Sequence, residues 1–126
     1  MRIISGSQRG RKLLGPRDAS IRPALDNIRE AVFNILSAEV EGARVLDLFC
    51  GVGAFGLEAL SRGARRTHFV DNSSGSLAIL GRNIELLGFD AFSSVEQGDA
   101  YGFSSADASA YDLVFADPPF PVFKDE

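Results

Sequence analysis

A glycine-rich turn between an apolar segment and a helical pattern constrains the fold of this chain more than any other feature. Residues 43–56 read Ala-Arg-Val-Leu-Asp-Leu-Phe-Cys-Gly-Val-Gly-Ala-Phe-Gly, so a short apolar strand precedes Gly51, Gly53 and Gly56. Glycines at this spacing let the backbone turn sharply and approach a nucleotide-like ligand at the amino end of the following helix. The segment predicts the first strand, turn and helix of an α/β fold, with a ligand site at the turn.

Acidic residues at three predicted strand ends narrow the identity of that ligand. A second strand is predicted at 66–70, and Asp71 at its tip is placed to hold the hydroxyl groups of a ribose. Asp47 lies four residues before the first glycine, where a carboxylate suits an ammonium group rather than a pyrophosphate. Asp99, followed by Ala100, ends a third strand and can accept a hydrogen bond from an adenine amino group. The implied ligand combines adenine, ribose and an amino acid, as S-adenosylmethionine does.

The tetrapeptide Asp-Pro-Pro-Phe closes a fourth apolar segment at 111–116. Two prolines also end a strand simply by withholding N–H donors and fixing φ, so the tetrapeptide alone is compatible with an ordinary loop. Next to a site for S-adenosylmethionine, its acid and carbonyl groups suit an exocyclic amino group and its aromatic ring suits a planar base. The candidate catalytic residues are Asp117, Pro118, Pro119 and Phe120.

Together these motifs resemble those of the class I methyltransferases that modify exocyclic nitrogens. More narrowly, the chain is similar to the bacterial methyltransferases that modify guanine N2 in small-subunit ribosomal RNA. The narrower resemblance rests on segments 2–6, 9–12, 22–23, 29–36 and 57–63 together with the motifs above, and it extends to about residue 120. It implies methyl transfer from S-adenosylmethionine to ribosomal RNA or the small ribosomal subunit, without a metal. The residues expected to bind the cofactor are Asp47, Phe49, Gly51, Gly53, Asp71, Asp99 and Ala100.

The family resemblance implies a Rossmann-like α/β fold, a mostly parallel sheet with helices on both faces. Its sheet has seven strands, whereas only four strand segments are found here, so we expect the last strands to be absent. The fourth strand would then expose residues 113–115 on an open apolar edge. We expect a basic hairpin and loop at 1–24 and an incomplete cofactor-binding core at 25–126. A complete chain of this kind is expected to be a monomer.

Positive charge is concentrated near the N-terminus. Residues 1–30 carry seven basic and three acidic side chains, a net charge of +4, whereas the remainder carries six basic and fourteen acidic side chains, a net charge of −8. A local basic cluster favours contact with a polyanion, although a solvated tail is the simpler alternative. The apolar pairs 3–4 and 13–14 indicate a hairpin instead of a tail. The candidate RNA-binding residues are Arg2, Arg9, Arg11, Lys12, Arg22 and Arg29.

Helical spacing predicts three helices. The first runs from a cap at Asp26 to about residue 37 and directs the apolar residues at 28, 32, 33, 35 and 36 toward the sheet. The second covers 54–61, and the third covers 74–87 and ends before a glycine. Residues 104–110 are predicted to be a short linker.

The composition excludes several classes of protein. No run approaches the ~20 apolar residues of a membrane span, and no signal sequence is recognisable, so a cytoplasmic location is expected. The single cysteine, Cys50, and the single histidine, His68, are interpreted as packing and structural residues, and they provide no zinc site.

Three alternatives remain open. The amino group could belong to DNA adenine or a protein glutamine. The protein could be a dinucleotide-dependent oxidoreductase, which Asp47 and the tetrapeptide at 117–120 disfavour. It could also be a non-catalytic RNA-binding or scaffold fragment.

Overall fold

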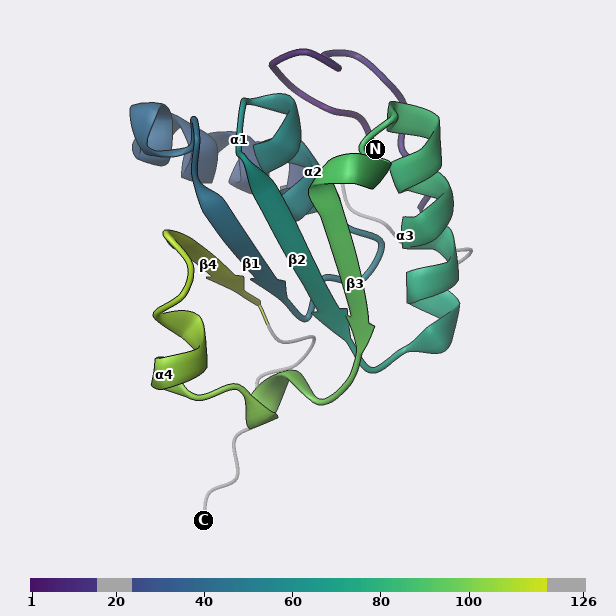
Figure 1. Cartoon of the computed structure of the whole chain (residues 1–126). Helices are drawn as coiled ribbons and strands as arrows, with labels where there is room; N and C mark the ends of the chain where they lie inside the picture. Colours follow the sequence, from purple (N-terminus) through teal and green to yellow (C-terminus); the bar gives the residue numbers. More distant parts are fainter. Residues whose placement is uncertain (16–23, 118–126) are drawn as a thin grey trace.

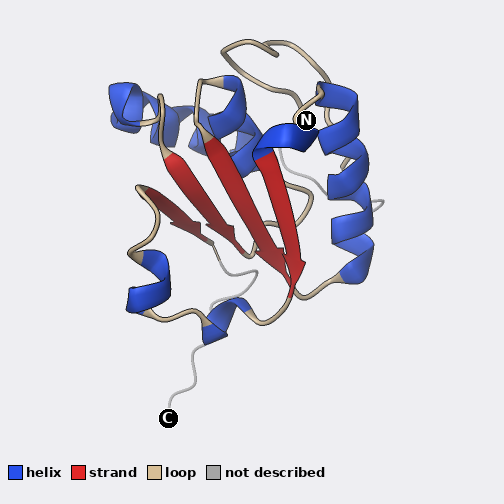
Figure 2. Ribbon diagram, in the orientation of Figure 1, coloured by secondary structure: helices blue, strands red, loops and turns tan. Residues whose placement is uncertain are grey.

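Four parallel strands form one sheet in the computed structural model, which describes residues 1–15 and 24–117 (Figures 1 and 2). The strands are β1 (Arg44–Leu48), β2 (Arg66–Asp71), β3 (Ser93–Gln97) and β4 (Leu113–Ala116). Their spatial order is β3-β2-β1-β4. The chain moves outward from β1 to β3 and then crosses back to the other side of β1, so the carboxyl ends of all four strands meet at one edge of the sheet. β4 pairs with β1 and forms one border of the sheet.

Helices connect the strands largely as predicted. The α-helices are α1 (Ala24–Leu36), α2 (Ala54–Ser61), α3 (Ser74–Leu87) and α4 (Ser105–Ala108). Short 3-10 turns are η1 (Ser37–Glu39), η2 (Asp90–Phe92) and η3 (Ala100–Gly102). Gly88 ends α3 with φ of 72°, which confirms the predicted glycine stop. The predicted linker contains α4 instead, because Ser104 and Asp107 form a reciprocal capping box that stabilises this single turn.

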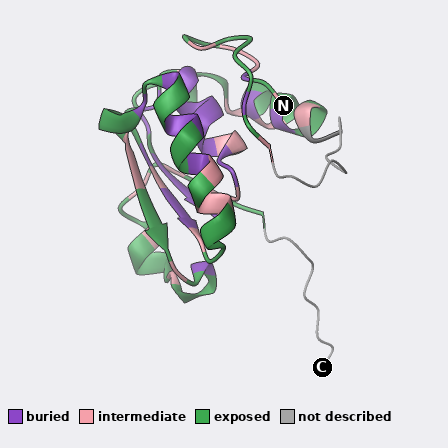
Figure 3. Ribbon diagram, turned by 90° about the vertical axis from the view of Figure 1, so that its right-hand side faces the viewer, coloured by how far each residue is buried: buried purple, intermediate pink, exposed green. Residues whose placement is uncertain are grey.

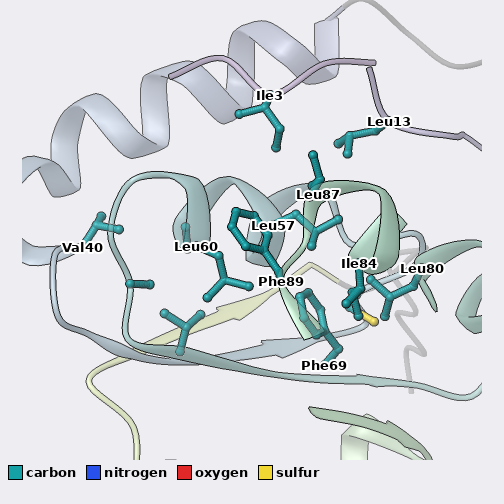
Figure 4. Close-up of a cluster of buried hydrophobic side chains, with 14 of the residues drawn as sticks. Ile3, Leu13, Val40, Leu57, Leu60, Phe69, Leu80, Ile84, Leu87 and Phe89 are labelled. Carbon is teal, nitrogen blue, oxygen red and sulfur yellow. The ribbon is translucent and has the colours of Figure 1, made fainter. Parts of the chain in front are cut away.

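The helices cover the two faces of the sheet unequally. α1, α2 and α3 contribute Phe33, Leu57 and Leu80 to the large hydrophobic core on one face. Figure 4 shows Leu57 and Leu80 within this core. On the other face, Leu46 and Val70 are covered by the connection from β3 to β4, which contains η3 and α4. β1 is buried beyond its first residue, whereas β3 at the sheet border is half-buried or exposed (Figure 3). A parallel α/β fold with helices on both faces is confirmed.

The orientation of α1 differs from the prediction. Phe33 is 1% exposed and packs against Phe55 and Phe115, with ring centroids 6.2 and 5.4 Å away. Ile28 and Ile35 are 53% and 80% exposed, so the expectation that both face the sheet is wrong. The helix instead directs Phe33 and the residue one turn earlier, Arg29, into the protein. The aromatic contacts and a buried ion pair therefore decide the rotation of α1.

The N-terminal segment forms the predicted hairpin. Arg2 and Lys12 are antiparallel partners, and the N–H of Ile3 donates to the carbonyl of Arg11 at 2.9 Å. Ile3 and Leu13 are buried and point toward the layer formed by α2 and α3 (Figure 4). The hairpin is therefore packed on the core, which excludes a solvated tail for these residues.

β4 has no further strand beside it in the described part of the chain. Val114 is 42% exposed, whereas Leu113 and Phe115 are half-buried, so the predicted apolar edge is present but partly covered. No described helix is both long and apolar enough to cross a membrane.

Candidate functional site

The glycine turn joins β1 to α2 at the carboxyl edge of the sheet. Gly51 and Gly53 have φ of 56° and 94°, which lie in the left-handed region that glycine adopts without a steric penalty. Phe49 also has a positive φ, 59°, which is uncommon for a residue with a side chain. This conformation accompanies an edge-to-face contact of its ring with Tyr101, with centroids 4.8 Å apart. The turn and an aromatic pair are therefore positioned together.

Gly56 has a different function from the other two glycines. Its φ is not positive, but a Cβ at this position would overlap the ring of Phe69 and lie 2.9 Å from Oδ2 of Asp47. The absence of a side chain lets α2 approach the sheet closely. The N–H of Gly56 then donates to Asp47 Oδ2 at 2.9 Å, so this close approach also supplies a hydrogen bond to the site.

Gly56→Ala is expected to lower the free energy of unfolding by about 1–3 kcal/mol, because the added methyl group overpacks the interface between α2 and the sheet. Gly81→Ala is the matched control, since Gly81 lies in α3 and a Cβ there meets nothing within 4 Å. The control should gain up to about 1 kcal/mol from helix propensity. Urea unfolding measures both changes, and equal effects would contradict the packing role of Gly56.

Three carboxylates gather around the turn. Asp47 is 3% exposed, and its pKa is raised to about 7, mainly by burial and further by the charges of Asp71 and Asp117. The hydrogen bond from Gly56 opposes this rise. Asp71 accepts hydrogen bonds from the N–H of Gly51 at 2.8 Å and from the N–H of Ser73 at 2.9 Å. The ends of β1, β2 and β4 thus create a negative site at the turn, and Asp71 also braces the glycine backbone.

A cavity of about 550 Å³ opens beside β1 and β4. Its wall is mainly apolar and aromatic, with Asp47 and Asp117 as its two acidic residues. The lining residues are Met1, Ile28, Val32, Asp47, Phe49, Cys50, Val52, Ala54, Phe55, Val114, Phe115, Ala116 and Asp117. The cavity therefore places two of the predicted acids beside an apolar wall. Asp71 and Asp99 do not line it, because Asp71 ends β2 and Asp99 follows β3.

Asp99 is the N-cap of η3, which begins at Ala100 after the end of β3. Asp99 Oδ1 accepts a hydrogen bond from the N–H of Tyr101 at 2.9 Å, and Ala100 is 6% exposed. Tyr101 is 64% exposed, and its ring contacts Phe49 across the turn. Tyr101 is not among the predicted site residues, although it lies only two positions after Asp99.

The predicted RNA-binding residues divide into exposed and buried groups. Arg2, Arg9, Arg11 and Lys12 are exposed on the hairpin, and Arg11 donates to the carbonyl of Leu86 at 2.8 Å. Arg22 lies outside the described residues, as do Pro118, Pro119 and Phe120 of the predicted catalytic set.

The prediction that Arg29 contacts RNA is wrong. Its side chain is 1% exposed, and its guanidinium lies 3.6 Å from the buried carboxylate of Glu58 and 3.3 Å from Asp26. It also donates to the carbonyl of Arg2. Arg29 therefore stabilises the contact between α1, α2 and the hairpin.

Other reactive side chains have structural surroundings. Burial raises the pKa of the Cys50 thiol far above its ordinary value, so the thiolate is suppressed. His68 lies between Ser94 Oγ at 2.6 Å and Glu96 Oε1 at 2.9 Å on the neighbouring strand. Among the described residues, no group of three or more histidine, cysteine or acidic side chains could hold a metal ion.

Comparison with known proteins relates this arrangement to methyltransferases. "Putative rRNA methyltransferase YlbH" of Bacillus subtilis is 37% identical over 123 residues, which cover 95% of this chain and 67% of that protein. Ribosomal RNA small subunit methyltransferase D of Escherichia coli K12 is 38% identical over 120 residues, which cover 95% of this chain and 60% of that enzyme. The chain thus spans about three fifths to two thirds of the length of these relatives.

Solved structures that are titled as methyltransferases also resemble this chain. "Putative methyltransferase yhhF" from Escherichia coli superposes with a TM-score of 0.77 at 33% identity, covering 95% of this chain and 64% of the other. The structure titled "SMU.776, a putative methyltransferase complexed with SAH" has a TM-score of 0.64 at 26% identity, and the match covers 79% of this chain and 26% of the other. A model of the family described as conserved hypothetical protein 95 matches residues 1–124. The chain therefore belongs to this family, through a match that includes the hairpin, the glycine turn and the strand-end acids.

Proposed function

We propose that this chain contains the cofactor-binding part of an enzyme that transfers a methyl group from S-adenosylmethionine to the N2 amine of a guanine in small-subunit ribosomal RNA. The observation that carries the proposal is the convergence of Asp47, Asp71 and Asp117 from three strand ends on one glycine turn. Neighbouring carboxylates raise the free energy of each other's ionised forms, and a cationic ligand relieves that repulsion.

The chemistry of these donors fits the proposed cofactor. S-adenosylmethionine carries an ammonium and a sulfonium group, whereas a dinucleotide presents a negatively charged pyrophosphate. Asp47, buried at the turn, is suited to the ammonium group. Asp71 is suited to the ribose hydroxyls, while Phe49, Asp99 and Tyr101 form a surface suited to adenine. The SAH complex of a related structure supports this choice over the oxidoreductase alternative.

The protein's contribution to methyl transfer is mainly alignment. When bound, S-adenosylmethionine supplies an already activated methyl group. The Asp117 carboxylate and the Pro118 carbonyl would accept hydrogen bonds from the guanine amino group and direct its lone pair at that methyl group. Phe120 would stack on the base after it leaves its own stack. The guanine nitrogen would lose its proton to Asp117 or to water as it takes the methyl group.

The hairpin supports RNA as the substrate that carries the amino group. Arg2, Arg9, Arg11 and Lys12 are exposed there and can contact phosphates, whereas a protein glutamine offers no such polyanion. DNA adenine offers phosphates too, but both named relatives above are called rRNA methyltransferases. An enzyme of ribosomal RNA would act in the cytoplasm.

Calorimetric titration with S-adenosylhomocysteine tests the cofactor half of the proposal, with NAD as the negative control. We expect binding of the former alone. Asp71→Ala should weaken it by about 10-fold or more, because the variant loses both a ribose acceptor and the bond that braces Gly51. Asp90→Ala, an exposed acid in η2, is the matched control and should retain wild-type affinity.

Incubation with ribosomal RNA and labelled S-adenosylmethionine tests the second part of the proposal, methyl transfer to RNA. Label should appear on guanine N2. RNA binding by a folded chain that has no affinity for S-adenosylhomocysteine would favour a scaffold fragment instead.

A further inference from the structure

A buried acid in α2 holds the basic hairpin in place. Glu58 is 0% exposed, and its carboxylate oxygens accept hydrogen bonds from the N–H groups of Ile4 at 2.9 Å and Ser5 at 3.0 Å. The same carboxylate pairs with Arg62 at 2.8 Å and Arg29 at 3.6 Å. Two N–H groups and two guanidinium groups therefore surround one buried negative charge.

The next turn of α2 adds a backbone contact to this attachment. Ser61 Oγ donates to the carbonyl of Ser5 at 2.7 Å and accepts from the N–H of Gln8 at 2.9 Å. The N–H of Ser7 donates to the carbonyl of Ser61 at 2.7 Å. A Cβ at Gly6 would overlap that same carbonyl, so the hairpin backbone lies directly on the helix.

The other end of the hairpin is attached to the glycine turn through α3. Asn83 is 0% exposed, and its Oδ1 accepts from the N–H of Leu14 at 2.8 Å. Its Nδ2 donates to the carbonyl of Leu14 at 3.0 Å and to that of Val52 at 3.1 Å. Val52 belongs to the turn and also lines the cavity. One amide group thus connects the hairpin backbone with the backbone that is proposed to hold the cofactor.

We propose that Glu58 and Asn83 are positioning residues, which hold the basic hairpin in one orientation relative to the cofactor turn. This inference rests on the proposed function. Phosphate contacts on the hairpin fix the register of a bound RNA only if the hairpin itself is fixed. Glu58 lies five residues after Gly53, so the helix that begins at the turn also carries the hairpin's attachment. The two residues therefore align the RNA-binding surface with the site of methyl transfer.

Stability alone is a weak explanation for this arrangement. A buried ion pair contributes little net stability compared with apolar residues of similar volume, because removing two charges from water is costly. Orientation is a stronger explanation, since a displacement of about 1 Å between reacting groups can cost about 100-fold in rate. The positioning role predicts a loss in kcat that is separate from RNA affinity.

Glu58→Gln tests the role directly, because it keeps the shape and one carbonyl acceptor but removes the charge. We expect kcat for RNA methylation to fall by at least about 10-fold, while the Kd values for S-adenosylhomocysteine and RNA change less than about 3-fold. Amide hydrogen exchange at Ile4 and Ser5 should increase, since both amides donate to Glu58. Glu85→Gln makes the same chemical change at an exposed position of α3 and should behave as wild type.

Two further variants keep the test conclusive. Asn83→Leu removes the second attachment without burying a charge. It should also lower kcat, and it therefore serves as the test if Glu58→Gln fails to fold. The double variant Arg9→Ala/Arg11→Ala should instead raise the RNA Kd and flatten its salt dependence.

The outcomes separate the two proposals. A wild-type protein that binds S-adenosylhomocysteine but methylates no ribosomal RNA overturns the RNA half of the proposed function. An active wild type with folded Glu58→Gln and Asn83→Leu variants of unchanged kcat overturns the positioning role alone. Variants that are less stable than the wild type but fully active in their folded fraction also overturn the positioning role alone.

Discussion

Replacing Asp117 with alanine is expected to reduce methyl transfer by about 10²–10³-fold while leaving the affinity for S-adenosylhomocysteine within about 3-fold of wild type. Asp117 directly follows β4 and lines the cavity beside Phe115. In the proposed mechanism its carboxylate orients the guanine amino group, which the cofactor product does not contain. The substitution therefore removes an interaction with the substrate and spares the cofactor contacts. Single-turnover rates and calorimetric titration measure the two quantities separately.

Asp117→Asn is the informative companion variant. It retains an oxygen that accepts a hydrogen bond but cannot take a proton, so activity well above that of Asp117→Ala would assign the main effect to orientation. Equal activity of both variants would assign it to the charge. A loss of S-adenosylhomocysteine affinity in Asp117→Ala as large as that in Asp71→Ala would contradict the proposed division between substrate and cofactor residues.

The second large effect concerns the pH dependence of cofactor binding. The pKa of Asp47 in the ligand-free protein is raised to about 7, chiefly by burial. Because only the ionised carboxylate attracts an ammonium group, affinity for S-adenosylhomocysteine should increase about 10-fold between pH 6 and pH 8. Asp47→Asn should abolish this increase and weaken binding at pH 8 by at least about 10-fold. A pH-independent affinity in the wild type would remove Asp47 from the ammonium site.

Ionisation of Asp47 should strengthen cofactor binding but lower the stability of the ligand-free chain. Its folded pKa of about 7 lies above the ordinary value of 3.8, so the folded state binds a proton more tightly than the unfolded state does. The resulting stabilisation is fully present below about pH 4 and is lost as pH rises through 7, with an upper limit of roughly 4 kcal/mol. Asp47→Asn should therefore stabilise the ligand-free chain at pH 8 relative to wild type. Urea unfolding at pH 5 and pH 8 measures the difference.

The local patterns of the sequence were sufficient for the strands, the glycine turn and two helices. Alternation of apolar strands with helical spacing specifies a parallel sheet, because parallel neighbours require a crossover between them. Gly53 and Gly88 mark a helix start and a helix end for reasons that depend only on backbone conformation. The acids Asp47, Asp71 and Asp117 could be placed near one another because each lies at or near the carboxyl end of a parallel strand.

The rotation of α1 could not be predicted in this way. Its spacing allowed Ile28 and Ile35 to be buried, yet Arg29 and Phe33 occupy the interior. An arginine is a poor candidate for burial unless its partner is known, and Glu58 lies 29 residues away in the sequence. The same limitation hid the role of Asn83, whose partners Leu14 and Val52 are distant along the chain.

Sequence alone determined the class of fold, the position of the turn and the set of acids around it, since these depend on backbone geometry and on the periodicity of neighbouring residues. Tertiary structure alone decided which polar side chains are buried, how the hairpin is attached to α2 and α3, and how far burial raises the pKa of Asp47. The physical reason is that burial of a charge depends on partners and on exclusion of water, both of which arise only when segments distant in the sequence pack together.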